Sequence, residues 1–378
     1  MAYGGLENYG KSKSGITPPS PGGALSTWNS NNNMSLDQAS LFNGGRIYGK
    51  VGAFIQATYQ DSQRTAHWDN ADIRYADTGN IGDHLILYGI TINNNPTVQD
   101  VWQTVPSWIF PYASPVMAPG APPTPTVWGA FAQHVLGTGA YLELDDAFYF
   151  EVAGYASLNQ RESQLVGMTG SANFNRLHGV NPYWRLTYDT HDGEQTFELG
   201  TYGMDFAIWP GNVSNLGSDH KTDFAIDASY QRFIDDNKHI ISLYGSAIHE
   251  NSNLASSVSQ GLATNNHLSL NTLTANASYY YNNTYGITVG RTMTSGSADA
   301  LAYGNSASGK PDTSFWTFQF DVTPFGSEAS YGAPYLNLRL FAQYTLYDKY
   351  FGAAKNYDGN GANARDNNTF FVGVWTAF

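Results

Sequence analysis

The sequence contains no cysteine, and charged residues make up only 13% of its 378 positions. Without thiols the chain can form no disulfide or thiolate zinc site, and it cannot attach a c-type haem covalently. We therefore expect no cofactor within this chain. It also has no uninterrupted apolar run of about 18 residues, which excludes membrane-spanning helices. Residues 1–33 lack the short apolar core of a signal peptide.

Aromatic residues, at 15% of the chain, outnumber charged ones, which is unusual for a soluble enzyme. Acidic residues exceed basic residues by 31 to 18, which leaves a net charge of −13. That charge disfavours nucleic-acid phosphates as partners and favours cations or a basic partner. No change in composition divides the chain, so a single large sheet or barrel fits better than two domains.

Alternation of apolar and polar residues is the dominant pattern. In 335–347, Leu338, Leu340 and Tyr344 share one face, while Arg339 and Gln343 share the other. Strict alternation predicts a strand with two different faces, whereas a core helix would repeat every three to four residues. We therefore expect arginine to destabilise the apolar face at Leu338 and to be tolerated at Gln343. The same alternation occurs at 53–60, 183–189, 223–231 and 315–322.

The pattern predicts fifteen clear strands, at 34–46, 49–61, 67–77, 83–94, 133–144, 146–157, 181–191, 194–206, 220–233, 237–251, 266–281, 284–295, 312–323, 334–349 and 368–378. Tight turns alternate with longer polar connections, which is the arrangement of an outer-membrane barrel. Barrels of this class have an even number of strands, so Met1–Tyr9 supplies a sixteenth. We expect the chain to begin within that strand, with natural sequence missing upstream.

The predicted fold is thus all-β, a transmembrane antiparallel up-and-down barrel of about 16 strands. Residues 1–33 form its first strand and a long loop, and 34–378 form the rest. The longest connection, 93–127, holds eight of the sixteen prolines together with Trp102, Trp108, Phe110 and Tyr112. Because this segment is too apolar for water, we expect it to fold inward and narrow or plug the lumen. The alternative is a cap over the barrel mouth.

Charged residues on the inward face of the predicted strands are candidates for lining the pore. Acidic groups outnumber basic ones among them, so the interior should favour cations. The alternative is that these charges pair with one another and hold the wall together. Arg291 falls on the lipid face, with no partner evident from the sequence. The predicted pore-lining residues are Asp72, Arg74, Glu143, Glu151, Arg185, Asp189, Glu198, Asp223, Asp227, Asp321 and Arg339.

The chain ends on an aromatic strand, FFVGVWTAF, at 370–378. This ending resembles the C-terminal strand of bacterial outer-membrane proteins, whose final phenylalanine is read by the barrel-insertion machinery. The resemblance implies that Phe378 is the insertion signal and that this machinery is a partner. It also implies, with the barrel pattern, a location in the bacterial outer membrane and contact with its lipid bilayer.

Three pieces of the sequence resemble the fused cytochrome-porins of the outer membrane. They are YGITINNNPTVQDVW at 88–102, GKPD at 309–312, and the stretch that runs from YDKY at 347–350 through NYDG at 356–359 to the C-terminus. Members of that family carry an N-terminal Cys-x-x-Cys-His haem site ahead of the barrel, and this sequence has none. The resemblance therefore implies a c-type haem either on a missing N-terminal segment or on a separate cytochrome partner.

Two functions follow from these observations. The first is a barrel or sheath for a c-type cytochrome in electron transfer across the outer membrane. The alternative is a passive diffusion porin with weak cation preference. We expect no enzymatic activity, because the sequence shows no nucleophile with an oriented base and no phosphate-binding glycine loop. The nine histidines are scattered, so no metal site is expected.

Overall fold

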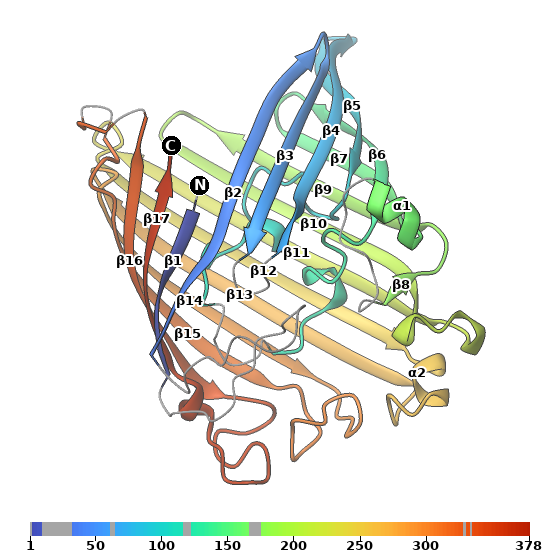
Figure 1. Ribbon diagram of the computed structural model, residues 1–378. Helices are drawn as coiled ribbons and strands as arrows, with labels where there is room; N and C mark the ends of the chain where they lie inside the picture. Colours follow the sequence, from blue (N-terminus) through green and yellow to red (C-terminus); the bar gives the residue numbers. More distant parts are fainter. Residues whose placement is uncertain are drawn as a thin grey trace.

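The computed structural model describes residues 2–9, 32–60, 65–115, 122–165, 175–327, 330–332 and 335–378. The chain forms one large antiparallel sheet in which successive strands are neighbours (Figure 1). Its long strands are β1 (Ala2–Tyr9), β2 (Asn33–Tyr48), β3 (Val51–Gln60), β4 (Thr65–Ile81), β5 (His84–Asn93), β6 (Leu136–Leu144), β7 (Phe148–Ala156), β9 (Asn181–His191), β10 (Gln195–Trp209), β11 (Asp219–Ile234), β12 (His239–Asn253), β13 (His267–Tyr281), β14 (Tyr285–Gly296), β15 (Thr313–Val322), β16 (Asn337–Lys349) and β17 (Thr369–Ala377).

The strand pairings return to their starting point. The backbone of β1 pairs with β2, where Ala2 lies opposite Ala39, and also with β17, where Ala2 lies opposite Thr376. β8 (Arg176–Leu177) is a two-residue addition beside β10, so β7 pairs directly with β9. Sixteen long strands thus form a ring within the described residues, and the predicted barrel is confirmed. The predicted long loop after the first strand lies mostly outside the described residues.

Short turns join most of the strand pairs at one end of the barrel, where the connection 323–336 between β15 and β16 is the long exception. The turns at Asp145–Asp146 and Asn282–Asn283 both have positive backbone φ angles, between 51° and 55°. Asp and Asn adopt this left-handed conformation more readily than other non-glycine residues, which is why they are favoured in tight hairpins. The sequence therefore located these turns correctly.

Longer connections occupy the opposite end of the barrel. They contain the short helices α1 (Gln160–Leu165), η3 (Pro210–Asn212), η4 (Ser214–Leu216), α2 (Ala255–Ser259) and η5 (Ala364–Asn367). None of the helices in the described part of the chain has the length and apolar character required to cross a membrane.

The two faces of the strands differ as predicted. On β15, Trp316, Phe318 and Phe320 are exposed, whereas the alternate residues Gln319 and Asp321 are buried. The same exposed apolar face is present on β7, β10, β12 and β17, through Phe150, Leu199, Leu243 and Val372. A closed sheet with an apolar outer face and a polar inner face is suited to lipid outside and water or protein inside.

Arg291, which had no evident partner in the sequence, forms an ion pair on the outer face. Its guanidinium contacts the Asp348 carboxylate of β16 and lies 4.8 Å from the centre of the Trp316 ring. The charge is therefore neutralised by a residue two strands away. Alternation on β14 alone could not show this, because the partner is 57 positions later in the chain.

Asp299 joins two of the long connections outside the barrel. Its carboxylate accepts hydrogen bonds from the backbone N–H groups of Thr264 and Asn265 at 2.8 and 2.7 Å, and of Leu301 and Ala302 at 3.0 Å. Burial alone would raise the pKa of Asp299, but these four hydrogen bonds lower it below its ordinary value. The loops 254–266 and 297–312 are thus held together by an ionised carboxylate.

We predict that Phe318→Arg destabilises the barrel by about 2–4 kcal/mol, because Phe318 is 42% exposed on the outer face near the middle of β15. The matched change Gln231→Arg lies on the inner face of β11 and should have a much smaller effect. Urea unfolding followed by heat-modified gel mobility measures both. Equal destabilisation by the two changes would show that the faces are wrongly assigned.

We predict that Asp299→Asn exposes loop 297–312 to chymotrypsin at pH 7, since Leu301 and Tyr303 lie within it. Because folding lowers the pKa of Asp299, its ionised carboxylate stabilises the two loops at every pH above about 3.9, the ordinary pKa of aspartate. This stabilisation is lost as the pH falls through the lower pKa of the folded protein. Asp299 is therefore ionised at pH 7, and the unmodified protein should resist cleavage there. Identical digestion of both forms at pH 7 would contradict this role.

Candidate pore constriction

The connection between β5 and β6 folds into the barrel (Figure 1). This inner loop, residues 94–135, contains η1 (Pro106–Trp108) and η2 (Thr126–Trp128) and is described at 94–115 and 122–135. The predicted inward-folded loop is confirmed, although it is longer than the expected 93–127. Gln133, with a φ of 66°, donates its backbone N–H to Asn94 at 2.9 Å and closes the base of the loop. The following strand therefore begins at Leu136, not at residue 133.

Apolar side chains bind one side of the inner loop to the barrel wall. Val105, Val127, Phe131 and Val135 are buried in a cluster with residues from β7 and from β9 to β12. The rings of Phe131 and Phe206 meet edge to face, with 5.0 Å between their centres. One part of the lumen is thus filled by a protein core. The wall contributes Ala153, Tyr155, Leu177 of β8, Tyr183, Tyr202, Met204, Phe206, Ile208, Ala225 and Ile248.

Arg185 connects this wall to the inner loop. Its guanidinium lies 2.9 Å from Asp227, 3.4 Å from Glu198 and 3.1 Å from Asp100 of the loop. The side chain is 2% exposed, and the Trp102 ring lies 5.2 Å from it. Such a buried cation needs nearby carboxylates to offset its loss of hydration. The sequence predicted three of these residues, Arg185, Glu198 and Asp227, but not Asp100.

A second polar contact involves residues that the sequence analysis missed. Glu250 of β12 accepts hydrogen bonds from the backbone N–H of Thr126 at 2.7 Å and from its hydroxyl at 2.5 Å. Lys221 donates to the same carboxylate at 2.9 Å. Asp223, a predicted residue, accepts the Val127 N–H at 2.7 Å. The alternation that placed Asp223 inward also places Lys221 and Glu250 inward, so the sequence contained a usable signal for both.

The inner loop also reaches the far side of the barrel. Phe110 packs on Gly290 of β14, where an added Cβ would lie only 2.8 Å from its ring. Gln343 of β16 donates its amide to the carbonyl of Ala113 at 3.1 Å and is 2% exposed. The expectation that Gln343 tolerates arginine was therefore wrong. Alternation identified its face correctly, but it could not show that the loop packs against that face.

The four aromatic residues predicted for a constriction occupy different environments. Trp102 packs on the Tyr149 ring with 5.4 Å between centres, and Phe110 is buried. Trp108 donates its indole N–H to the carbonyl of Val98 at 3.0 Å. Tyr112 donates its hydroxyl to Gln103 at 3.2 Å.

The remaining predicted lumen residues all lie on the inner face. Arg74 is paired with Asp72, and Arg339 contacts Asp321 at 2.7 Å. Glu151 accepts from the Tyr149 hydroxyl at 2.8 Å. Several of these charged residues thus pair with one another in the barrel wall, which was the alternative to a pore-lining role. That the predicted residues line a pore stays a prediction. Glu143 and Asp189 are partly exposed near the short turns, and Phe378 follows β17 and is exposed.

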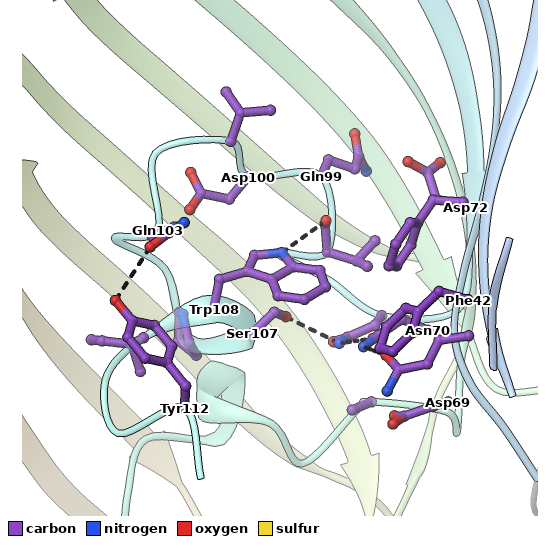
Figure 2. A pocket seen from close by; sticks show the side chains of 18 of the residues that line it. Phe42, Asp69, Asn70, Asp72, Gln99, Asp100, Gln103, Ser107, Trp108 and Tyr112 are labelled. Carbon is purple, nitrogen blue, oxygen red and sulfur yellow. Dashed lines mark hydrogen bonds between the residues drawn. The ribbon is translucent and has the colours of Figure 1, made fainter. Parts of the chain in front are cut away.

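A cavity of about 1240 Å³ lies between the inner loop and the wall formed by β2, β3 and β4 (Figure 2). Phe42, Phe54 and Trp108 line it together with polar residues such as Gln56 and Asn70. In Figure 2, Trp108 lies between the loop and the strand wall. The inner loop therefore leaves open space on this side of the barrel, and its role as a constriction stays a prediction.

Neither a family model nor a curated protein matches the sequence. Among solved structures, the chain is similar to the outer membrane channel DcaP of Acinetobacter baumannii, with 9% identity and a TM-score of 0.52 over 100% of this chain and 95% of that one. An anion-selective porin from Comamonas acidovorans is 10% identical, with a TM-score of 0.49 over 100% and 98%. OmpF of Salmonella typhi is 13% identical, with a TM-score of 0.48 over 100% and 97%.

The chain has the fold of an outer-membrane channel. The likeness to DcaP, at 9% identity, shows the fold alone. Together with the apolar outer face, this fold places the chain in the bacterial outer membrane. The resemblance to fused cytochrome-porins stays a prediction.

We predict that Arg185→Met destabilises the barrel by about 3–5 kcal/mol, because it leaves Asp100, Glu198 and Asp227 buried without their cation. Released from Asp100, the inner loop should also make single-channel currents noisier. The control is Arg232→Met, since Arg232 is exposed on β11. Urea unfolding and bilayer recording measure the two effects. If both variants unfold alike, Arg185 does not hold the loop.

Proposed function

We propose that this chain is a passive diffusion channel of the bacterial outer membrane for small hydrophilic solutes, with weak cation preference. The observation that carries the proposal is the inner loop, which is packed against the wall on several sides and leaves a cavity of about 1240 Å³ beside β2 to β4. Such an arrangement limits the size of what passes and leaves a route for water and solutes.

The charges inside the barrel support a preference for cations. Around Arg185 there are three carboxylates, and around Lys221 there are Glu250 and its neighbour Asp223. At the cavity itself, Asp69 accepts hydrogen bonds from Gln133 and Thr58, which are neutral groups. A negative field in a narrow passage raises the local concentration of cations.

The packing of the inner loop makes electron transfer through a sheathed cytochrome the weaker interpretation. A cytochrome inserted into the lumen would have to displace Val105, Val127 and Phe131 from their buried cluster and Asp100 from Arg185. The haem on an upstream segment or partner, implied by the resemblance, stays a prediction. A haem absorption band that co-purifies with the native protein from membranes would favour it.

We predict that the purified chain gives a small, stable conductance in planar bilayers. Under a potassium chloride gradient, the reversal potential should show modest preference for potassium. Asp69→Asn should reduce this preference, because it removes a carboxylate that lines the cavity. Glu194→Gln, in an exposed turn, is the matched control and should leave the reversal potential unchanged.

Two results would contradict the proposal. Absence of conductance from correctly folded protein, judged by heat-modified mobility, would exclude an open channel. A preference for chloride would leave the channel in place but show that the acidic wall does not set its selectivity.

A further inference from the structure

We propose that the cavity beside the inner loop is a binding site for neutral sugars, so that the channel takes up carbohydrates through a specific contact. This inference rests on the proposed channel function and names the class of solute that its constriction recognises. It is carried by two surfaces that meet in the cavity, one aromatic and one made of neutral hydrogen-bonding groups.

The aromatic surface crosses from the barrel wall to the inner loop. The ring centres of Phe42 on β2 and Phe54 on β3 are 6.0 Å apart, and those of Phe54 and Trp108 are 5.9 Å apart. The indole N–H of Trp108 is bonded to Val98, so the side chain offers its ring to the cavity (Figure 2). Flat apolar rings of this kind stack on the C–H face of a pyranose.

The hydrogen-bonding surface lies on the same strands. Gln38 donates to the hydroxyl of Ser40 at 2.5 Å, and Gln56 donates to it at 3.4 Å. Asn70 of β4 donates to Gln56 at 3.1 Å and is itself bonded to Asn95 of the loop. All of these side chains except that of Asn95 belong to strands of the wall, and together they present both donors and acceptors, as the hydroxyl groups of a sugar require.

The spacing of the two surfaces suits one solute that touches both. Phe54 and Gln56 are successive inward positions on β3, and Phe42 and Ser40 are successive inward positions on β2. Such positions are about 6.6–6.8 Å apart along a strand. A sugar ring stacked on Phe54 would therefore bring its hydroxyl rim within reach of Gln56.

The charges around the cavity favour a neutral solute. Asp72 is engaged by Arg74, and Asp100 is engaged by Arg185, so each of these two lining carboxylates is already paired with a cation. A bound carboxylate or phosphate would lie near the Asp69 and Asp100 side chains, which repel it. Among the described residues that line the cavity, the cation Arg74 is already paired with Asp72.

The volume is consistent with passage of a small sugar. Clefts and cavities that bind small molecules measure about 300–1,000 Å³. A cavity of about 1240 Å³ therefore holds a monosaccharide or disaccharide together with water, and it leaves the sugar free to move on.

The test measures block of single-channel potassium current by maltose, compared with a linear polyethylene glycol of similar mass. We expect saturable block by maltose and only weak, unsaturated reduction by the glycol, which has no ring to stack. Trp108→Leu and Gln56→Leu should each weaken maltose block by about tenfold, the change typical of losing one stacking or hydrogen-bonding partner. Trp209→Leu is the matched control, because Trp209 stacks on His178 at 4.9 Å and does not line the cavity.

The outcomes separate this inference from the channel function. A stable conductance with equal effects of maltose and glycol overturns the sugar site and keeps the channel. Saturable block that Trp108→Leu and Gln56→Leu leave unchanged also overturns the site. If no conductance is found, the channel proposal fails, and isothermal titration of maltose into the detergent-solubilised protein then tests the sugar site. A heat of binding that is absent in the Trp108→Leu variant supports the site. Absence of maltose binding to the unmodified protein overturns it.

Discussion

The main constraint on this structure is that the inner loop must bury its apolar side chains inside the barrel. The outer face already carries apolar residues toward the membrane, so the lumen is where Val105, Phe131 and Val135 find partners. Because these apolar side chains exclude water from the neighbouring wall, each charged side chain that points inward there needs a partner of opposite charge or a hydrogen bond. Arg185 and Lys221 meet this requirement at the two contacts with the loop.

This packing decides what the barrel can do. The loop is held on the β9 to β12 side by a hydrophobic core and ion pairs, so the free space lies on the β2 to β4 side. Under the proposed channel function, solutes would pass the aromatic surface of Phe54 and Trp108 that lines this cavity. A protein partner inside the lumen would have to break the core, whereas a small solute needs no such change.

Alternation predicted the strands and their faces well because it reflects a local property. Each side chain of a barrel strand points either toward the lipid or toward the interior. Whether the residue is apolar or polar indicates which of the two sides it faces. It did less well at contacts across the lumen. Gln343 was placed on the correct face, yet its bond to Ala113 joins residues 230 positions apart. Glu250 was overlooked although its face was predictable, because its role depends on Thr126 of the loop.

The sequence by itself determined fifteen alternating strands, the tight Asp and Asn turns, and the inward folding of an apolar, proline-rich segment. These depend on periodicity and local backbone preference, which are readable from neighbouring residues. Only the tertiary structure decided that Asp100 meets Arg185 and that Arg291 meets Asp348, over separations of 85 and 57 positions. The physical reason is that register and curvature of the closed sheet bring these side chains together, and neither leaves a mark in the local sequence.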